Sequence, residues 1–451
     1  MAHCETVLRK AAGLHVDECE AIHVRRRIIT ARITDSEIAE LKQNFEDMLG
    51  IRLIQEKKIL SAVSTDPDDL GIVERALQCR TILQPREFWR SLPSAKISPK
   101  VEKTYDKKLG SISSEGVADL ARAMIDSASH HRISRISGSL NLVTEDFEIK
   151  NSSGLERSDR ATYISGTINT ESEFGTNPVS GFGTMACRTS DSFSPSRIGR
   201  DAKEMCLDSI NPERCEPGTY SVIFEPYAMG EMLAFVFSSN FSLKTYSERR
   251  SCFSDRLGMK IAADDFSLVD DPHYPDGVGS KSFDDEGVPT SKLNLIDSGI
   301  FSSTYSDSFH AFREGQEPTG NASRMGNPMG RTADPIPVPA PHNLVIKNGQ
   351  ASLEEMVGET KRGLLVGRLW YTYSVNPERG DFSCTARSGI RMIENGKITS
   401  PGRPVRIVHN LPLLLQNIDC VGKDSRNILP WSALPSITPS VKVNGIRALP
   451  I

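Results

Sequence analysis

Residues 222–241, VIFEPYAMGEMLAFVFSSNF, start as a short strand and continue as a helix just past the middle of the chain. Pro226 is suited to the first turn of that helix, where the missing N–H of proline loses no hydrogen bond. Apolar residues then recur at helical spacing, so one face of the helix is expected to lie in a core. The stretch contains no histidine, and its two glutamates, Glu225 and Glu231, are weak catalytic candidates.

The composition argues against several classes of protein. The 451 residues carry a formal charge of −4 and a pI near 6.2, which does not favour a nucleic-acid surface. No apolar run approaches the roughly 20 residues that span a bilayer, and residues 1–10 carry charges where a signal peptide needs an apolar core. The nine cysteines are scattered and form no C-x-x-C motif. We therefore expect a cytoplasmic protein that binds neither nucleic acid nor membrane.

Apolar periodicity predicts mixed α and β structure in the first half of the chain. Helices are expected at residues 35–49, 116–128 and 198–210, strands at 137–155 and 160–169, a hairpin at 50–65 and a mobile loop at 171–196. The turn-rich residues 211–220 indicate a boundary between an N-terminal domain, 1–215, and a C-terminal domain, 216–451.

The second half is expected to be richer in strands and tight turns. Hairpins are predicted at 293–305 and 390–400, the latter because Asn395-Gly396 is a preferred pair for a type I′ turn. Residues 351–366 are predicted to be a helix, in which Ser352 and Glu355 have the spacing of a capping box. The Gly/Pro-rich residues 315–343 are expected to lack regular structure, and loops of that length in compact domains tend to be functional or disordered. The fold class is therefore α+β, with two domains.

Few local motifs carry chemistry. Among the nine histidines only His130 and His131 are close in sequence, and neither a P-loop nor a G-x-S-x-G nucleophile motif is present. Gly181 and Gly183 belong to a G-x-G-x-x-A pattern that lacks the strand and helix of a dinucleotide site. The acidic residues 284–286 are interpreted as a solvated turn.

One further histidine, His310, is a candidate general base. His310 is interpreted as a histidine on a surface helix, because the sequence places no carboxylate or nucleophile beside it.

The order of short motifs along the chain resembles the TldD/PmbA family of peptidase-related proteins. The matching segments are GIRLI, FEIKNSSGL, IGRDAKEM and GTYSVIFEP in the first part of the chain, then FDDEGVPTSKLNLIDSGIF, EPTGNASR, SLEEMVGETKRGLLV, NPERGDFSCTARSG, IENGKITSP and NLPLLLQNIDCVGKD. This resemblance covers nearly the whole chain. It implies an N-terminal mixed α/β domain and a C-terminal antiparallel, β-rich, barrel-like domain with helices.

The zinc motif of the TldD branch is missing from this chain. That branch carries H-E-x-x-x-H on the helix after the strand and a late cysteine, and zinc needs such a set of three ligands with one open position. The histidine positions fall near Ala234 and Ser239, the glutamate falls near Phe235, and residues 426–434, RNILPWSAL, contain no cysteine. We therefore expect no metal in this chain and no peptidase activity from the chain alone.

What remains resembles the PmbA branch, also called TldE, which pairs with a TldD-type subunit. The resemblance implies a zinc-bearing partner, a shared channel and an unfolded peptide as substrate. The loop from Gly315 to Pro341 is a candidate to line this channel, and a purely structural loop is the alternative. We expect Thr319, Gly320, Asn321 and Arg324 to bind substrate, with backbone amides meeting peptide carbonyls and Arg324 holding a carboxylate.

Two alternatives stay open at this point. The chain could be a hydrolase in its own right that uses carboxylates such as Glu225, Glu231 or Asp284, although the sequence shows no partner group for them. It could also be a homodimeric peptide-binding protein without an enzymatic partner. The natural peptide, the cleavage specificity and the choice between a homo-oligomer and a hetero-oligomer do not follow from the sequence.

Overall fold

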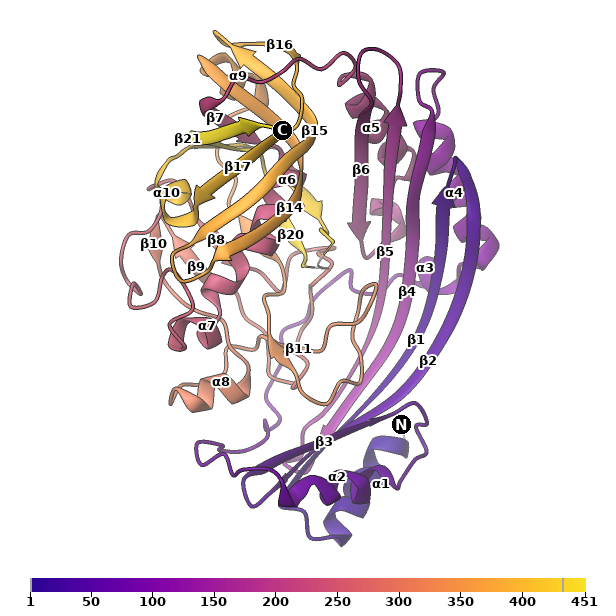
Figure 1. Cartoon of the computed structure of the whole chain (residues 1–451). Helices are drawn as coiled ribbons and strands as arrows, with labels where there is room; N and C mark the ends of the chain where they lie inside the picture. Colours follow the sequence, from indigo (N-terminus) through magenta and orange to yellow (C-terminus); the bar gives the residue numbers. More distant parts are fainter. Residues whose placement is uncertain (1, 432–433) are drawn as a thin grey trace.

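Six antiparallel strands dominate the first half of the chain. The computed structural model describes residues 2–431 and 434–451, and its N-terminal sheet has the order β3-β2-β1-β4-β5-β6. The strands are β1 (Glu18–Thr34), β2 (Glu37–Gln55), β3 (Lys58–Ser64), β4 (Arg135–Asn151), β5 (Glu156–Ser172) and β6 (Val179–Cys187). Four of them have 17 or more residues, about three times the usual strand length. The sheet therefore curves along one whole side of the molecule (Figure 1).

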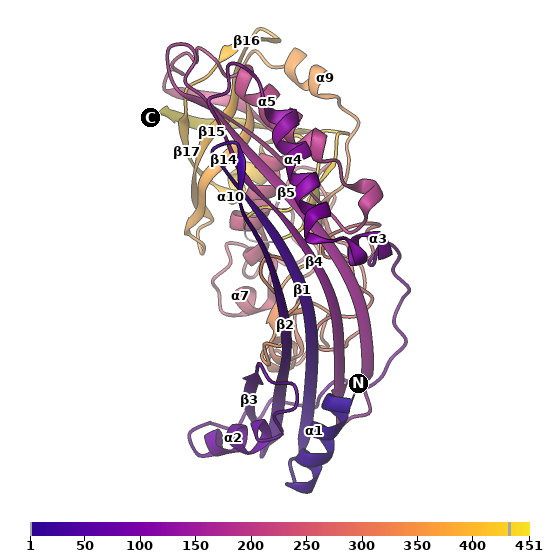
Figure 2. The same ribbon diagram turned by 90° about the vertical axis from the view of Figure 1, so that its right-hand side faces the viewer.

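The two faces of this sheet differ because apolar and polar residues alternate along its strands. Apolar side chains such as Leu140, Ile164 and Ile168 pack under α4 (Ser114–Ala128) and α5 (Pro195–Leu207), which cover the outer face (Figure 2). A separate core joins the far end of the sheet to α1 (Ala2–Gly13) and α2 (Ile72–Gln78). The inner face is left to the second half of the chain.

Glycines bring the outer helices unusually close to the sheet. A Cβ atom added at Gly181 of β6 would lie 2.0 Å from the carbonyl oxygen of Ala202 on α5, and one at Gly183 would lie 2.0 Å from that of Ile198. The G-x-G pattern therefore serves helix–sheet packing.

The second half of the chain is built on a barrel-like sheet of five strands. Their order is β14-β7-β21-β17-β15, and β15 also pairs with β14, which closes the ring. The strands are β7 (Gly218–Phe224), β14 (Arg362–Asn376), β15 (Asp381–Glu394), β17 (Val405–Asn410) and β21 (Val441–Pro450), extended by β16 (Lys397–Pro401) and β18 (Ile418–Val421). Side chains from this sheet and the helix after β7 form the largest apolar core.

A second sheet lies beside the barrel-like sheet, with the order β10-β9-β8-β13-β20-β19. Its strands are β8 (Leu268–Asp270), β9 (Leu293–Asp297), β10 (Ile300–Phe301), β13 (Leu344–Ile346), β19 (Arg426–Ile428) and β20 (Ser436–Thr438). The remaining strands, β11 (Ala322–Ser323) and β12 (Val338–Pro339), pair with each other inside the Gly/Pro-rich segment.

Short helices complete the fold. They are α3 (Lys107–Ser111), α6 (Pro226–Met232), α7 (Leu243–Ser247), α8 (Ser308–Arg313), α9 (Leu353–Gly358) and α10 (Leu411–Gln416), with the 3₁₀ turns η1 (Cys79–Thr81), η2 (Ser190–Ser192) and η4 (Ser238–Phe241) and the π-helical η3 (Leu233–Phe237). No helix in the described part of the chain is both long and apolar enough to cross a membrane.

Most of the predicted elements are confirmed. The α+β class with a β-rich, barrel-like second half is observed, as are the two helices α4 and α5 and the strands β4 and β5. The three predicted hairpins are β2–β3, β9–β10 and β15–β16, and Asn395 and Gly396 both have positive φ, as a type I′ turn requires. The capping box of Ser352 and Glu355 is present at α9.

Three local predictions are wrong. Residues 35–49 form a hairpin turn and much of β2, not a helix, because β1 pairs with this segment along its whole length. Backbone pairing with a long neighbouring strand outweighs a weak local preference for helix. The predicted mobile loop at 171–196 contains β6. The helix predicted over 351–366 ends at Gly358, and β14 begins at Arg362.

The close approach of α5 to β6 can be tested at Gly183. Gly183→Ala places a methyl group against backbone, so we expect it to lower the free energy of unfolding by about 1–3 kcal/mol, as overpacking does. Gly358→Ala is the control, because an added Cβ there meets nothing within 4 Å, and its effect should stay within about 0.5 kcal/mol. Urea titrations measure both, and equal effects would contradict this packing.

Candidate functional site

The helix after β7 begins as predicted and then widens. Pro226 is its first residue, and its apolar face lies in the main core. After Met232 the helix continues as the π-helical turn η3. This geometry is rare in proteins, and where it occurs it is often at a functional site. This helix contacts β14, β19 and β20, at the side of the C-terminal half that faces the long sheet (Figure 1).

The two glutamates of this segment have different partners. Both oxygens of Glu225 lie 3.1 Å from Nη2 of Arg391 on β15, so this carboxylate is held in an ion pair. Burial raises the pKa of Glu225, and the charge of Arg391 opposes that rise. Among the described residues, neither glutamate is hydrogen-bonded to a nucleophile or to a second acid.

Glu231 is the more perturbed of the two. Its side chain is buried, and its Oε2 accepts a hydrogen bond of 2.7 Å from the backbone N–H of Leu369. Burial raises its pKa to about 8, while the charge of Arg368 and the hydrogen bond from Leu369 act in the other direction. At neutral pH most of this carboxyl is therefore protonated, which makes it a poor nucleophile.

The residues at the zinc-motif positions do not fit a metal. Ala234 and Phe235 lie on η3, and Ser239 is exposed on the following turn, so none of the three offers a histidine nitrogen or a carboxylate. Within residues 2–431 and 434–451, no group of three His, Cys, Asp or Glu side chains could hold an ion. The expected position of the late cysteine includes Ser432 and Ala433, which lie outside the described residues.

A large groove runs between the inner face of the long sheet and the C-terminal half. Its volume is about 810 Å³. Much of its wall consists of polar side chains, most of them small, from alternate positions of four strands: Arg32 and Thr34 of β1, Ser137, Ser139 and Asn141 of β4, Ser165, Thr167 and Asn169 of β5, and Thr184 of β6. Such side chains can donate and accept hydrogen bonds with little demand on the shape of a bound chain.

One end of this groove is aromatic and contains a cation. Phe182 of β6 and Tyr227 of α6 pack with ring centroids 4.4 Å apart, and Trp431 lies on the same wall. Behind them, the guanidinium of Arg368 stacks 4.0 Å from the ring of Phe182 and 4.7 Å from that of Trp370. Sequence reasoning missed this cluster, because its members come from β6, α6, β14 and the loop after β19 and share no local spacing.

The four residues predicted to bind substrate lie in the Gly/Pro-rich segment, which is folded tightly against its neighbours. Thr319 Oγ1 donates to the carbonyl of Ser306, and the Asn321 side chain donates to Asp270 at 2.6 Å. Gly320 has φ +78°, and its position leaves no room for a Cβ atom next to Pro289. The backbone N–H of Asn321 donates to the carbonyl of Ser306.

Arg324 is fully buried, and its donors already have partners. Nη2 donates to Glu20 of β1 at 2.6 Å, Nε donates to the carbonyl of Asp285 at 2.9 Å, and Nη1 donates to the carbonyl of Asp334. Substrate binding by these four residues stays a prediction, and for Arg324 it would require this network to open.

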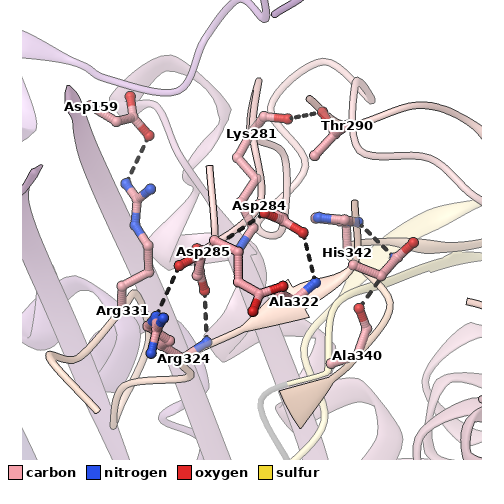
Figure 3. Close-up of polar contacts among 12 residues, drawn as sticks. Asp159, Lys281, Asp284, Asp285, Thr290, Ala322, Arg324, Arg331, Ala340 and His342 are labelled. Carbon is pink, nitrogen blue, oxygen red and sulfur yellow. Dashed lines mark hydrogen bonds and ion pairs between the residues drawn. The ribbon is translucent and has the colours of Figure 1, made fainter. Parts of the chain in front are cut away.

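The interpretation of the acidic residues 284–286 as a solvated turn is wrong, because all three side chains are buried. Asp284 accepts the N–H of Ala322, and Asp285 accepts the N–H of Arg324 (Figure 3). Burial and the neighbouring Glu286 raise the pKa of Asp284. The turn is buried because cations from other segments reach it, a fact that local sequence does not reveal.

These carboxylates belong to a network of buried charges that joins the two halves of the chain. Arg52 of β2 lies 2.8 Å from Glu20 and 2.6 Å from Glu286. Arg331 lies 2.6 Å from Glu145, and it also pairs with Asp159 at 2.7 Å, a contact drawn in Figure 3. Burial would raise the pKa of Glu286, but the charge and hydrogen bond of Arg52 hold it below its ordinary value.

The interpretation of His310 is also corrected. This histidine is buried on α8, and its Nδ1 lies 2.7 Å from Oδ1 of Asp307, the residue that caps the helix. A carboxylate three residues earlier was visible in the sequence and supplies the partner that we did not expect.

The network predicts a large cost for removing one cation. Arg52→Ala leaves Glu20 and Glu286 buried without their shared partner, and we expect a loss of about 3–5 kcal/mol of unfolding free energy. Arg25→Ala on β1 is the matched control, because its ion pair with Asp146 is exposed, and it should cost no more than about 1 kcal/mol. A small loss for Arg52→Ala in urea titrations would show that the network is not needed.

The protonation of Glu231 predicts a pH-dependent stability. The folded state keeps this proton up to about pH 8, whereas the unfolded chain releases it near the ordinary value of 4.5, so stability falls as pH rises between these values. Glu231→Gln removes that fall and should gain on the order of 3 kcal/mol at neutral pH. The exposed Glu354→Gln is the control. The measurement is the free energy of unfolding as a function of pH, and parallel profiles for wild type and Glu231→Gln would contradict the raised pKa of Glu231.

Most of the chain is similar to known proteins related to PmbA and TldD. A family model described as "PmbA/TldA metallopeptidase C-terminal domain" matches residues 217–448, and one described as the central domain matches 107–210. A protein named "Metalloprotease" from Methanothermobacter thermautotrophicus is 24% identical over 405 residues, 87% of this chain and 85% of that one. "Metalloprotease PmbA" of Escherichia coli O157:H7 is 27% identical over 263 residues, 58% of this chain and 54% of that one.

The solved structures agree. The crystal structure of TldE from Thermococcus kodakarensis matches with a TM-score of 0.89 at 26% identity, over 99% of each chain. The resemblance drawn from the short motifs is confirmed, and this chain belongs to the PmbA/TldD family of metallopeptidase-related proteins.

Proposed function

We propose that this chain is the non-catalytic, TldE/PmbA-like subunit of a heteromeric peptidase. A zinc-bearing TldD-type subunit cuts, and this chain binds the unfolded peptide in a channel that the two share. Two observations together carry the proposal. A groove is present and reaches Tyr227 of α6, whereas Ala234, Phe235 and Ser239, farther along the same helical segment, stand where the TldD branch has its zinc motif.

The chemistry of the groove suits an unfolded peptide. Ser, Thr and Asn side chains line it from alternate strand positions, so they can bond successive main-chain N–H and C=O groups of an extended segment. Main-chain bonding gives affinity with little sequence demand. The aromatic end at Phe182, Tyr227 and Trp431 adds contact area for apolar side chains.

The environment of the two glutamates supports a non-catalytic role. Glu225 is held by Arg391, and Glu231 is mostly protonated at neutral pH, so neither is poised to activate water. The proposed compartment is the cytoplasm, where a reducing environment suits nine free cysteines.

The test combines this chain with a TldD-type homologue encoded by the same genome. We expect native mass spectrometry to show one copy of each chain with zinc on the partner, and an unfolded peptide to be cut by the pair but not by this chain alone. Cleavage by this chain alone that Glu225→Ala or Glu231→Ala abolishes would favour a carboxylate hydrolase instead. A metal-free homodimer that ignores the partner would overturn the heteromeric proposal.

Blocking the groove tests peptide binding separately. Thr167→Trp fills the inner face of β5, so peptide binding should weaken about tenfold or more, equivalent to about 1.4 kcal/mol. Glu115→Trp is the control, because it adds the same ring to the exposed side of α4, on the other face of the sheet. Fluorescence anisotropy of a labelled unfolded peptide measures both variants, and equal binding would place the peptide elsewhere.

A further inference from the structure

Arg368 is a buried cation in which two of the three side-chain nitrogen atoms make no hydrogen bond to the described residues. It lies on β14 with 4% of its surface exposed, and its Nη1 donates to Asn169 Oδ1 at 2.7 Å. Nε and Nη2 are buried, and neither has a hydrogen-bond partner in the part of the chain that the structure describes. An unmade hydrogen bond on a buried charged group costs free energy, and a ligand that completes it recovers that cost. Within the described chain, Arg26, Arg52 and Arg331 each leave one such nitrogen unbonded, whereas Arg368 leaves two.

The unused donors have a definite shape. In a guanidinium group Nε–H and Nη2–H point the same way from one edge, and this edge matches the two oxygens of a carboxylate. The aromatic rings of Phe182 and Trp370 lie over the guanidinium, 4.0 and 4.7 Å away, and hold its plane. The edge is therefore oriented before any ligand arrives.

No carboxylate of the described chain fills this edge. The other deeply buried arginines bind carboxylates or several carbonyl oxygens: Arg52, Arg324 and Arg331 in the ionic network, Arg26 with Glu46, and Arg188 with four carbonyls. No ion pair joins Arg368 to an acidic side chain among residues 2–431 and 434–451. Glu231, whose charge would act on it, directs Oε2 to the N–H of Leu369 and is mostly protonated at neutral pH.

Arg368 also lies directly behind the groove. Asn169, Phe182 and Trp431 line that cavity, and each of them contacts the guanidinium. Trp431 is the most exposed of the three, with 64% of its surface exposed, and its ring centroid is 5.8 Å from the guanidinium carbon. For a ligand in the groove to reach the guanidinium edge, this indole has to move aside.

We propose that Arg368 is a carboxylate-binding residue at the aromatic end of the groove, and that it anchors a bound peptide through a carboxylate. The proposal rests on the proposed function for the identity of the ligand as a peptide. The anchor orders one end of the peptide and fixes which segment extends along the small polar side chains of the inner face. Arg368 thus takes the role that sequence reasoning had given to Arg324, whose donors are occupied.

The test uses an N-acetylated tripeptide of apolar residues, its C-terminal amide, and the amide with glutamate as last residue. Tryptophan fluorescence and calorimetry on the full chain measure binding, since Trp370 and Trp431 flank the site. We expect wild type to prefer the acid over the apolar amide by about 10- to 100-fold, as a charge-assisted pair does. Preference for the glutamyl amide as well would add a side-chain carboxylate as source.

Variants separate the proposed role from a merely structural one. Arg368→Gln should remove the preference for the acid and leave affinity for the apolar amide unchanged, and Arg368→Lys, which keeps the charge but not the two-point edge, should retain part of it. Arg362→Gln on the same strand, whose guanidinium stacks on Tyr220, should behave as wild type. Equal binding of acid and both amides by wild type, or an equal loss for all peptides in Arg368→Gln, would overturn the proposal.

A peptide-free arm keeps this proposal distinct from the proposed function. Sodium acetate is titrated against sodium chloride at equal ionic strength, with tryptophan fluorescence as readout. An acetate effect that Arg368→Gln abolishes supports the carboxylate site even where no peptide binds, and in that case the peptide channel is the part that fails. No acetate effect together with no preference for acidic peptides overturns the site itself.

Discussion

The buried ionic network between the two halves of the chain is the constraint on which the arrangement depends. Glu20, Arg52 and Glu145 come from the long sheet, whereas Glu286, Arg324 and Arg331 come from turns and loops of the second half. Charges taken out of water are tolerated only when they are paired and bonded in good geometry. Each half therefore supplies what the other needs, and the Gly/Pro-rich segment is held in place by these pairs despite its lack of regular structure.

The ionic network also explains why part of the inner face of the long sheet is left open as the wall of a groove. The outer face is apolar and closed by α4 and α5, but the inner face carries Ser, Thr and Asn side chains that need no apolar cover. Docking the second half at one end of the sheet, through the network, leaves the rest of that face as the wall of a groove of about 810 Å³. The groove thus results from the way in which the second half of the chain packs against the long sheet.

At the aromatic end of the groove, the molecule keeps charges that a purely structural core would avoid. Glu231 holds a proton at neutral pH because of its burial, and Arg368 leaves two donors unbonded beside it. Both features cost stability. Glu231 lies on α6, in the helical segment where the resemblance places the metal motif of the TldD branch, and Arg368 lies on β14, which contacts α6. Proteins give up stability in this way at functional sites.

Local sequence determined the elements that depend on neighbours in the chain: the capping box at Ser352, the type I′ turn at Asn395-Gly396, the alternation in β4 and β5, and the absence of zinc ligands at Ala234, Phe235 and Ser239. Tertiary structure decided the rest. Residues 35–49 became a strand because β1 pairs with them along their whole length, and the acidic residues 284–286 became buried in a network in which Arg52 of β2 pairs with Glu286. The cluster around Arg368 could not be read in advance, since its residues come from four separate segments. Helical periodicity and turn chemistry act over a few residues, but charge pairing and cavity formation depend on groups that only the folded chain brings together.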